Sequence, residues 1–210
     1  MTLRNMRIVL WVAAGLVAAL AVAVLLGGLL SGDGREAVPA SVAGSGIGGS
    51  FSMVDQSGRA VTEADFEGRP QAMFFGFTSC PDICPTMLTQ MSNWLDELGP
   101  LADRIQPIFV SVDPERDTVD VIKKYLSAFD PRITGLTGTP EQVASFAKNY
   151  GVFYEKVPTD GGDYTMNHTA NILLFGADGS FRGTADYHDD PADAQAKLRR
   201  LAENVGVGNG

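Results

Sequence analysis

The hydrophobic pattern divides the chain into three parts. From Ile8 to Leu30 the residues are apolar and uncharged. At about 1.5 Å per residue, a helix of this length crosses a hydrocarbon core of about 30 Å. The next stretch is rich in glycine, serine and alanine, which is typical of a flexible tether. The pattern therefore predicts a membrane anchor over residues 1–30, a linker over 31–48 and a folded domain over 49–205.

Within the domain, apolar or alternating runs are followed by segments with helical spacing. The runs predict strands over residues 51–55, 59–62, 72–77, 105–112, 152–157, 170–175 and 180–185. Helical spacing and capping residues predict helices that end near Leu98, Phe129, Gly151 and Gly206. In the second of these helices, Val121 and Ile122 are expected on the apolar face. This order predicts an α/β fold with an N-terminal β-hairpin and a mixed central sheet flanked by helices on both faces.

Charges around the apolar run predict its orientation. Arg4 and Arg7 precede it, and Asp33 and Glu36 follow it. The positive-inside rule then leaves the N-terminus in the cytoplasm and the domain outside. A cleaved signal peptide is the alternative, but its apolar region would be about 7–15 residues long. No room for a transit peptide precedes Ile8. We therefore expect a single-pass protein of the bacterial inner membrane, with its C-terminal domain in the oxidising periplasm.

Composition excludes two classes of protein. The net charge is −9 and no run of lysine or arginine occurs, which argues against a nucleic-acid partner. The chain has only two cysteines, too few for a disulfide scaffold.

Both cysteines, Cys80 and Cys84, lie where the strand predicted over 72–77 gives way to a helix. Their spacing would bring both sulfurs to one side of a helical turn. The positive end of the helix dipole favours thiolates there. Two thiolates suit Cu(I), zinc or an iron–sulfur centre, and they could equally close a disulfide. A buried, purely structural role is the alternative, but neighbouring prolines and an aspartate argue against it.

The two histidines differ in their surroundings. His168 lies just before the strand predicted over 170–175, and it would face the cysteines if that strand neighboured the one over 72–77. An imidazole and two thiolates form a three-coordinate Cu(I) site, or three of four zinc ligands. An ordinary hydrogen-bonded histidine is the alternative. His188 lies among acidic residues, and we expect it in an exposed loop.

The sequence resembles the SCO/SenC family of thioredoxin-like copper proteins over about Gly49 to Leu201. The matching segments occur in the family's order: Phe75–Pro85, Ser111–Thr118, Gly135–Gly138 and the residues around His168. The resemblance implies a thioredoxin-like fold that binds Cu(I) and Cu(II), with Cys80, Cys84 and His168 as the metal ligands. Asn167 stands where the family often has aspartate, and no departure removes a ligand.

The resemblance also implies a role in assembling the copper A centre of cytochrome c oxidase. A metallochaperone would take copper from a periplasmic donor and deliver it to subunit II. A thiol–disulfide oxidoreductase would instead keep the cysteines of subunit II reduced, drawing on a periplasmic thiol reductant. The metallochaperone is favoured, because three residues separate the cysteines and His168 lies in a stretch without proline, where thioredoxins place a cis-proline. A thiol peroxidase and a scaffold without a site are further alternatives.

Overall fold

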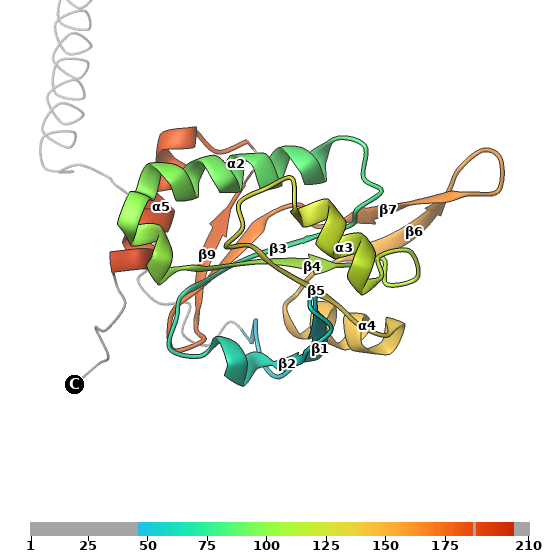
Figure 1. Ribbon diagram of the computed structural model, residues 1–210, viewed down its shortest axis with the longest axis horizontal. Helices are drawn as coiled ribbons and strands as arrows, with labels where there is room; N and C mark the ends of the chain where they lie inside the picture. Colours follow the sequence, from blue (N-terminus) through green and yellow to red (C-terminus); the bar gives the residue numbers. More distant parts are fainter. Residues whose placement is uncertain (1–45, 187, 204–210) are drawn as a thin grey trace, which may run out of the picture. The chain divides into compact units, whose positions relative to one another are not determined.

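The computed structural model describes residues 46–186 and 188–203 (Figure 1). The predicted anchor over 1–30, and the predicted linker up to residue 45, lie outside these ranges. Within them, no helix has both the length and the apolar content needed to cross a membrane. The anchor therefore stays a prediction.

A seven-stranded mixed sheet forms the centre of the described domain. Its strands are β1 (Ser52–Asp55), β2 (Ala60–Thr62), β3 (Gln71–Gly76), β4 (Gln106–Ser111), β5 (Thr134–Thr137), β8 (Ile172–Phe175) and β9 (Phe181–Ala185). They lie in the order β2-β1-β5-β4-β3-β8-β9. β3, β4 and β5 are parallel, and the remaining neighbours are antiparallel. The predicted α/β fold and its N-terminal hairpin, β1–β2, are confirmed.

Helices cover both faces of this sheet, as predicted (Figure 1). They are α2 (Ile83–Leu98), α3 (Val119–Leu126), α4 (Pro140–Asn149) and α5 (Pro191–Glu203), with short 3-10 helices η1 (Glu63–Phe66) and η2 (Gly99–Arg104). On one face the Phe109 ring of β4 lies 5.8 Å from the Tyr125 ring of α3. On the other face the Phe75 ring of β3 lies 5.3 Å from the Phe146 ring of α4. The sheet is therefore the middle of three layers.

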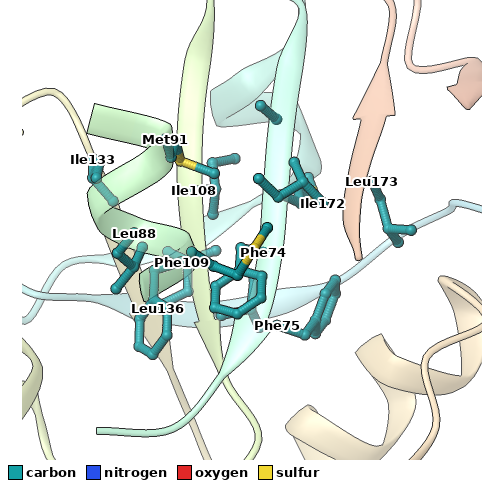
Figure 2. Close-up of a cluster of buried hydrophobic side chains, with 14 of the residues drawn as sticks. Phe74, Phe75, Leu88, Met91, Ile108, Phe109, Ile133, Leu136, Ile172 and Leu173 are labelled. Carbon is teal, nitrogen blue, oxygen red and sulfur yellow. The ribbon is translucent and has the colours of Figure 1, made fainter. Parts of the chain in front are cut away.

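β3 is the rigid centre of the core. All six of its residues are buried, because β4 pairs along one edge, β8 pairs along the other and helices cover both faces. Figure 2 shows Phe74 and Phe75 of β3 packed among side chains of β4, β8 and α2. Burial on this scale holds the carboxyl end of β3 firmly in place, and the cysteine loop leaves from that end.

Two features of the fold were not predicted. β5 lies between β1 and β4 where no strand was expected. The strands β6 (Tyr154–Pro158) and β7 (Tyr164–His168) form a separate two-stranded sheet, which we call the arm. Figure 1 shows the arm projecting from the body of the domain. β6 corresponds to the strand predicted over 152–157, but no strand was predicted over the residues of β7.

Candidate metal centre

Cys84 lies in the first turn of α2 and is fully buried against β3. A Cβ atom placed on Gly76, at the end of β3, would lie only 3.0 Å from the Cys84 sulfur. Glycine at that position therefore leaves room for the sulfur. Pro85 follows in the same turn, where its missing N–H costs no helical hydrogen bond. The expectation that both cysteines avoid the packed core is wrong for Cys84.

Cys80 is partly exposed and lies in the loop before α2, not within the helix. The prediction that a helical turn aligns the two sulfurs is therefore wrong. Instead the Cys84 backbone N–H donates to the Cys80 sulfur at 3.4 Å. Asp82 occupies the N-cap position, but its side chain makes no capping bond. The Cys80 sulfur thus accepts from one of the free N–H groups at the start of the helix.

His168 ends β7 and reaches the buried cysteine. Its Nε2 atom lies 3.4 Å from the Cys84 sulfur. Its Nδ1 atom lies 2.9 Å from the carbonyl oxygen of Thr169. A carbonyl only accepts, so in the neutral ring Nδ1 carries the proton and the Nε2 lone pair faces Cys84. The strand β8 that follows does neighbour β3, which was the condition for this approach.

The two thiols have opposite acidities. The Cys84 thiol donates a hydrogen bond to Cys80 and lowers the pKa of Cys80 to about 4, with smaller contributions from the backbone N–H groups of Cys84 and Asp82. Donation of that bond and burial raise the pKa of Cys84 above its ordinary value. At neutral pH the pair therefore holds one proton, with Cys80 as the thiolate and Cys84 as the thiol.

We expect iodoacetamide to alkylate Cys80 but not Cys84 at about pH 6, where an ordinary cysteine is mostly protonated. The rate, followed by mass spectrometry across pH, should have its midpoint near the Cys80 pKa of about 4. Because the bond from Cys84 is the largest cause of this low pKa, Cys84→Ala should move the midpoint upward. A midpoint near that of a free thiol in the unsubstituted protein would contradict the assignment.

Asp117 supports the cysteine loop, although its role was not predicted. Its side chain is fully buried in the loop that follows β4. Thr78 donates to it twice, from its backbone N–H at 3.0 Å and its hydroxyl at 2.6 Å. The Ser111 hydroxyl also donates, at 2.6 Å. Asp117 therefore fixes the backbone two residues before Cys80. The signals in the sequence were a polar segment directly after a buried strand and its place in the matching segment Ser111–Thr118.

The second histidine lies apart from this site, and the three proposed ligands are not yet arranged around a metal position. His188 is exposed in the loop between β9 and α5, as predicted, and its N–H donates to Asp186. In the part of the chain that the structure describes, no three His, Cys, Asp or Glu side chains form a ready-made metal site. Cys80, Cys84 and His168 are thus arranged as a hydrogen-bonded group, and a metal ion would have to replace those bonds.

Comparison with known proteins identifies relatives over the described domain. The SCO1/SenC family model matches residues 40–203. The yeast mitochondrial protein SCO2 is 39% identical over 163 residues, which cover 76% of this chain and 53% of that protein. The chain spans 53% to 62% of the length of the first curated relatives it matches.

Solved structures show the same fold. The structure of Bradyrhizobium japonicum ScoI with copper bound is 48% identical, with a TM-score of 0.69, over 74% of this chain and 99% of that one. The structure of yeast Sco1 with copper bound is 34% identical, with a TM-score of 0.69, over 75% of this chain and 89% of that one. The predicted thioredoxin-like architecture is therefore that of Sco proteins.

Proposed function

Because this chain belongs to the SCO1/SenC family, we propose that it binds copper through Cys80, Cys84 and His168. The proposal further assigns it the delivery of that copper to the copper A centre of cytochrome c oxidase subunit II. The observation that carries the proposal is the approach of the His168 Nε2 lone pair to within 3.4 Å of the Cys84 sulfur. Relatives with copper bound support the choice of metal.

The donor set fits copper. Two thiolate sulfurs and one imidazole are soft and borderline ligands, which Cu(I) prefers over oxygen. Cys80 is already a thiolate at neutral pH, so only the proton on Cys84 has to leave. The hydrogen bond from His168 Nδ1 to the Thr169 carbonyl keeps Nε2 unprotonated and orients the ring. The copper ion is cargo, so a site of only three ligands suits its later transfer.

The exposure of the two cysteines suggests the route of exchange. Cys80 is partly exposed, whereas Cys84 is fully buried beneath it. A partner's thiolate can therefore reach copper on the Cys80 side before it displaces Cys84. Low ligand number and one accessible sulfur both favour exchange over permanent binding.

We place the domain in the bacterial periplasm, tethered by the apolar run from Ile8 to Leu30. The support is the length of that run and the arginines Arg4 and Arg7 before it. A tether of about 18 residues then lets the domain reach an oxidase in the same membrane.

His168→Ala tests the proposed function. We expect it to weaken Cu(II) binding by more than about a hundredfold, because the imidazole is the only nitrogen donor of the proposed set. Copper stoichiometry and competition titration measure the change. His188→Ala is the matched control, because it removes the other histidine from an exposed loop. Unchanged Cu(II) affinity in His168→Ala would contradict ligation by this residue.

One observation favours a second function, the reduction of the cysteines of subunit II. The Cys80 thiolate lies beside a second thiol, as in a dithiol reductant. Cys80 would attack a disulfide sulfur of the partner, and Cys84 would then release the partner's reduced thiols and leave a Cys80–Cys84 disulfide. A periplasmic thiol reductant would have to reduce that disulfide. If His168→Ala still restored oxidase activity in a deletion strain, reduction would be favoured over copper delivery.

A further inference from the structure

We infer that Tyr164 is a positioning residue for the copper site, because it latches the arm that carries His168 to the loop after β4. This inference rests on the copper binding proposed above. It concerns a residue outside the proposed ligand set, at the opposite end of β7 from His168.

The arm has no backbone pairing with the main sheet. β7 pairs only with β6, and the two strands form a sheet of their own. In that sheet His168 is paired with Tyr154, which also belongs to the arm. The ladder shapes the arm, and β8, which begins four residues after His168, ties that end of the arm to β3. The end at Tyr164 has no such tie, so side-chain contacts with the body of the domain have to hold it.

Tyr164 supplies several of these contacts. Its hydroxyl donates to Asp113 Oδ1 at 2.9 Å, and Asp113 is almost fully buried. The Arg116 Nη1 group donates to the Tyr164 carbonyl at 2.9 Å. The guanidinium carbon of Arg116 also lies 3.8 Å from the centre of the Tyr164 ring. Arg116 and Asp113 are joined by an ion pair, so the three residues close a ring of contacts. Hydrogen bonds and a cation–π contact thus act together at one point.

The latch is connected to the metal site in two ways. Tyr164 and His168 are four apart on one strand, so their side chains lie on the same face. Arg116 also lies 6.0 Å from the centre of the Phe77 ring, which packs 5.7 Å from the His168 ring. A shift of the arm at Tyr164 would therefore move the His168 ring relative to the Phe77 ring against which it packs.

The same loop holds the cysteine side of the site. Asp113 accepts a hydrogen bond from Tyr164. Four residues further along the same loop, Asp117 accepts a hydrogen bond from Thr78 at the start of the cysteine loop. Residues 113–117 thus contact both segments that carry the proposed ligands. This shared anchor, together with the pairing of β8 and β3, sets the distance between His168 and the two sulfurs.

Tyr164→Phe tests the latch, because it removes the hydroxyl and keeps the ring that stacks on Arg116. We expect the Cu(II) affinity to fall by about tenfold to a hundredfold, the range for residues that orient a metal ligand. The Cu(I) affinity should change by less than about threefold, since the sulfurs dominate Cu(I) binding. The sulfur-to-Cu(II) charge-transfer band should weaken in parallel. Unfolding of the variant would instead lower the affinities for Cu(I) and Cu(II) together, so this difference separates a shift of His168 from a loss of folding.

A readout without copper tests the position of His168 directly. In the metal-free full-length protein, the ¹⁵N resonances of the His168 ring report its tautomer and its contact with Cys84. We expect one ordered tautomer in the unsubstituted protein and averaged, broadened signals in Tyr164→Phe. Arg116→Lys is a second variant, which keeps the charge but loses the planar stack, and it should change the same signals.

Tyr150→Phe is the matched control. The Tyr150 hydroxyl donates to the Gly49 carbonyl at 3.1 Å, away from the cysteine loop, so its removal should leave both copper affinities unchanged. If Tyr164→Phe changes neither the Cu(II) affinity nor the His168 resonances, the latch is refuted. If the unsubstituted protein binds no copper, the proposed function fails, and the resonances of the metal-free protein still decide whether Tyr164 positions His168.

Discussion

Replacement of Cys84 with serine is expected to lower the Cu(I) affinity by roughly a thousandfold while leaving the domain folded. Structural zinc in zinc-finger peptides binds with an apparent free energy of about 10–16 kcal/mol, which sets the scale for a site built on thiolates. One of three ligands then accounts for about 4 kcal/mol, or roughly a thousandfold in affinity. Serine matches cysteine in shape, and its hydroxyl can still donate to the Cys80 sulfur as the thiol does. Competition titration with a Cu(I) chelator measures the loss.

The buried position of Cys84 makes this substitution more informative than one at Cys80. Cys84 is packed against Gly76 and faces His168, so it belongs to both halves of the site. Circular dichroism and thermal unfolding should show a folded domain without metal. A folded Cys84→Ser protein that binds Cu(I) as tightly as before would contradict ligation by Cys84.

Replacement of Asp117 with alanine is expected to destabilise the domain by about 3 kcal/mol at neutral pH. Three donors from Thr78 and Ser111 would lose their buried acceptor, and each such loss costs about 1–3 kcal/mol. Relief of the buried carboxylate offsets part of that cost. Urea unfolding measures the change. Asp160→Ala is the control, because Asp160 is exposed in the loop between β6 and β7.

The same variant should alter the dependence of stability on pH. Burial raises the pKa of Asp117 above that of an ordinary carboxyl group. Its protonated form is therefore favoured by folding, and this stabilisation is complete below the unfolded pKa of about 4. It is lost as the pH rises through the higher folded pKa. Asp117→Ala and Asp117→Asn should both remove this decline, whereas a decline that persists in both variants would assign it to another group.

Local sequence signals predicted the elements that depend on local chemistry. Helix α4, one of the predicted helices, begins with the Thr139 and Gln142 capping box and with Pro140 in the first turn, residue types that favour a helix start. The apolar run that became β3 was recognisable because every one of its residues is buried. The hairpin between β8 and β9 turns at Asp178 and Gly179, where glycine adopts a φ of 71°.

Elements that depend on distant contacts were missed. β5 has only four residues with a glycine among them, and it is a strand because β1 and β4 pair with it on either side. Gly135 has to be small there, since a Cβ atom would lie 2.4 Å from Ile122 of α3. Val121 was expected on the buried face, yet it is 39% exposed, because the buried side of α3 runs through Ile122 and Leu126, one turn apart, and Val121 lies beside that line.

The site was predictable in its residue types but not in its supports. Cys80, Cys84 and His168 stand out in the sequence as thiols and an imidazole beside strand ends. Tyr164 and Arg116 do not, because a tyrosine and an arginine are common on any surface and acquire a role only through the pairing of the arm. The position of Cys80 before the helix was also missed, because the spacing of the two cysteines was read as one helical turn, whereas α2 begins only at Ile83.

The pairing of β3 with β8 has a consequence for how the protein matures. Cys84 and His168 are 84 residues apart, and they meet only after β8 has docked beside β3. Contacts of such long sequence separation form late, since loop-closure entropy has to be overcome first. During synthesis the two thiols are therefore unprotected, and the nascent chain has no competent site until its C-terminal third has been made. Loading with copper is consequently a step that follows folding and does not guide it.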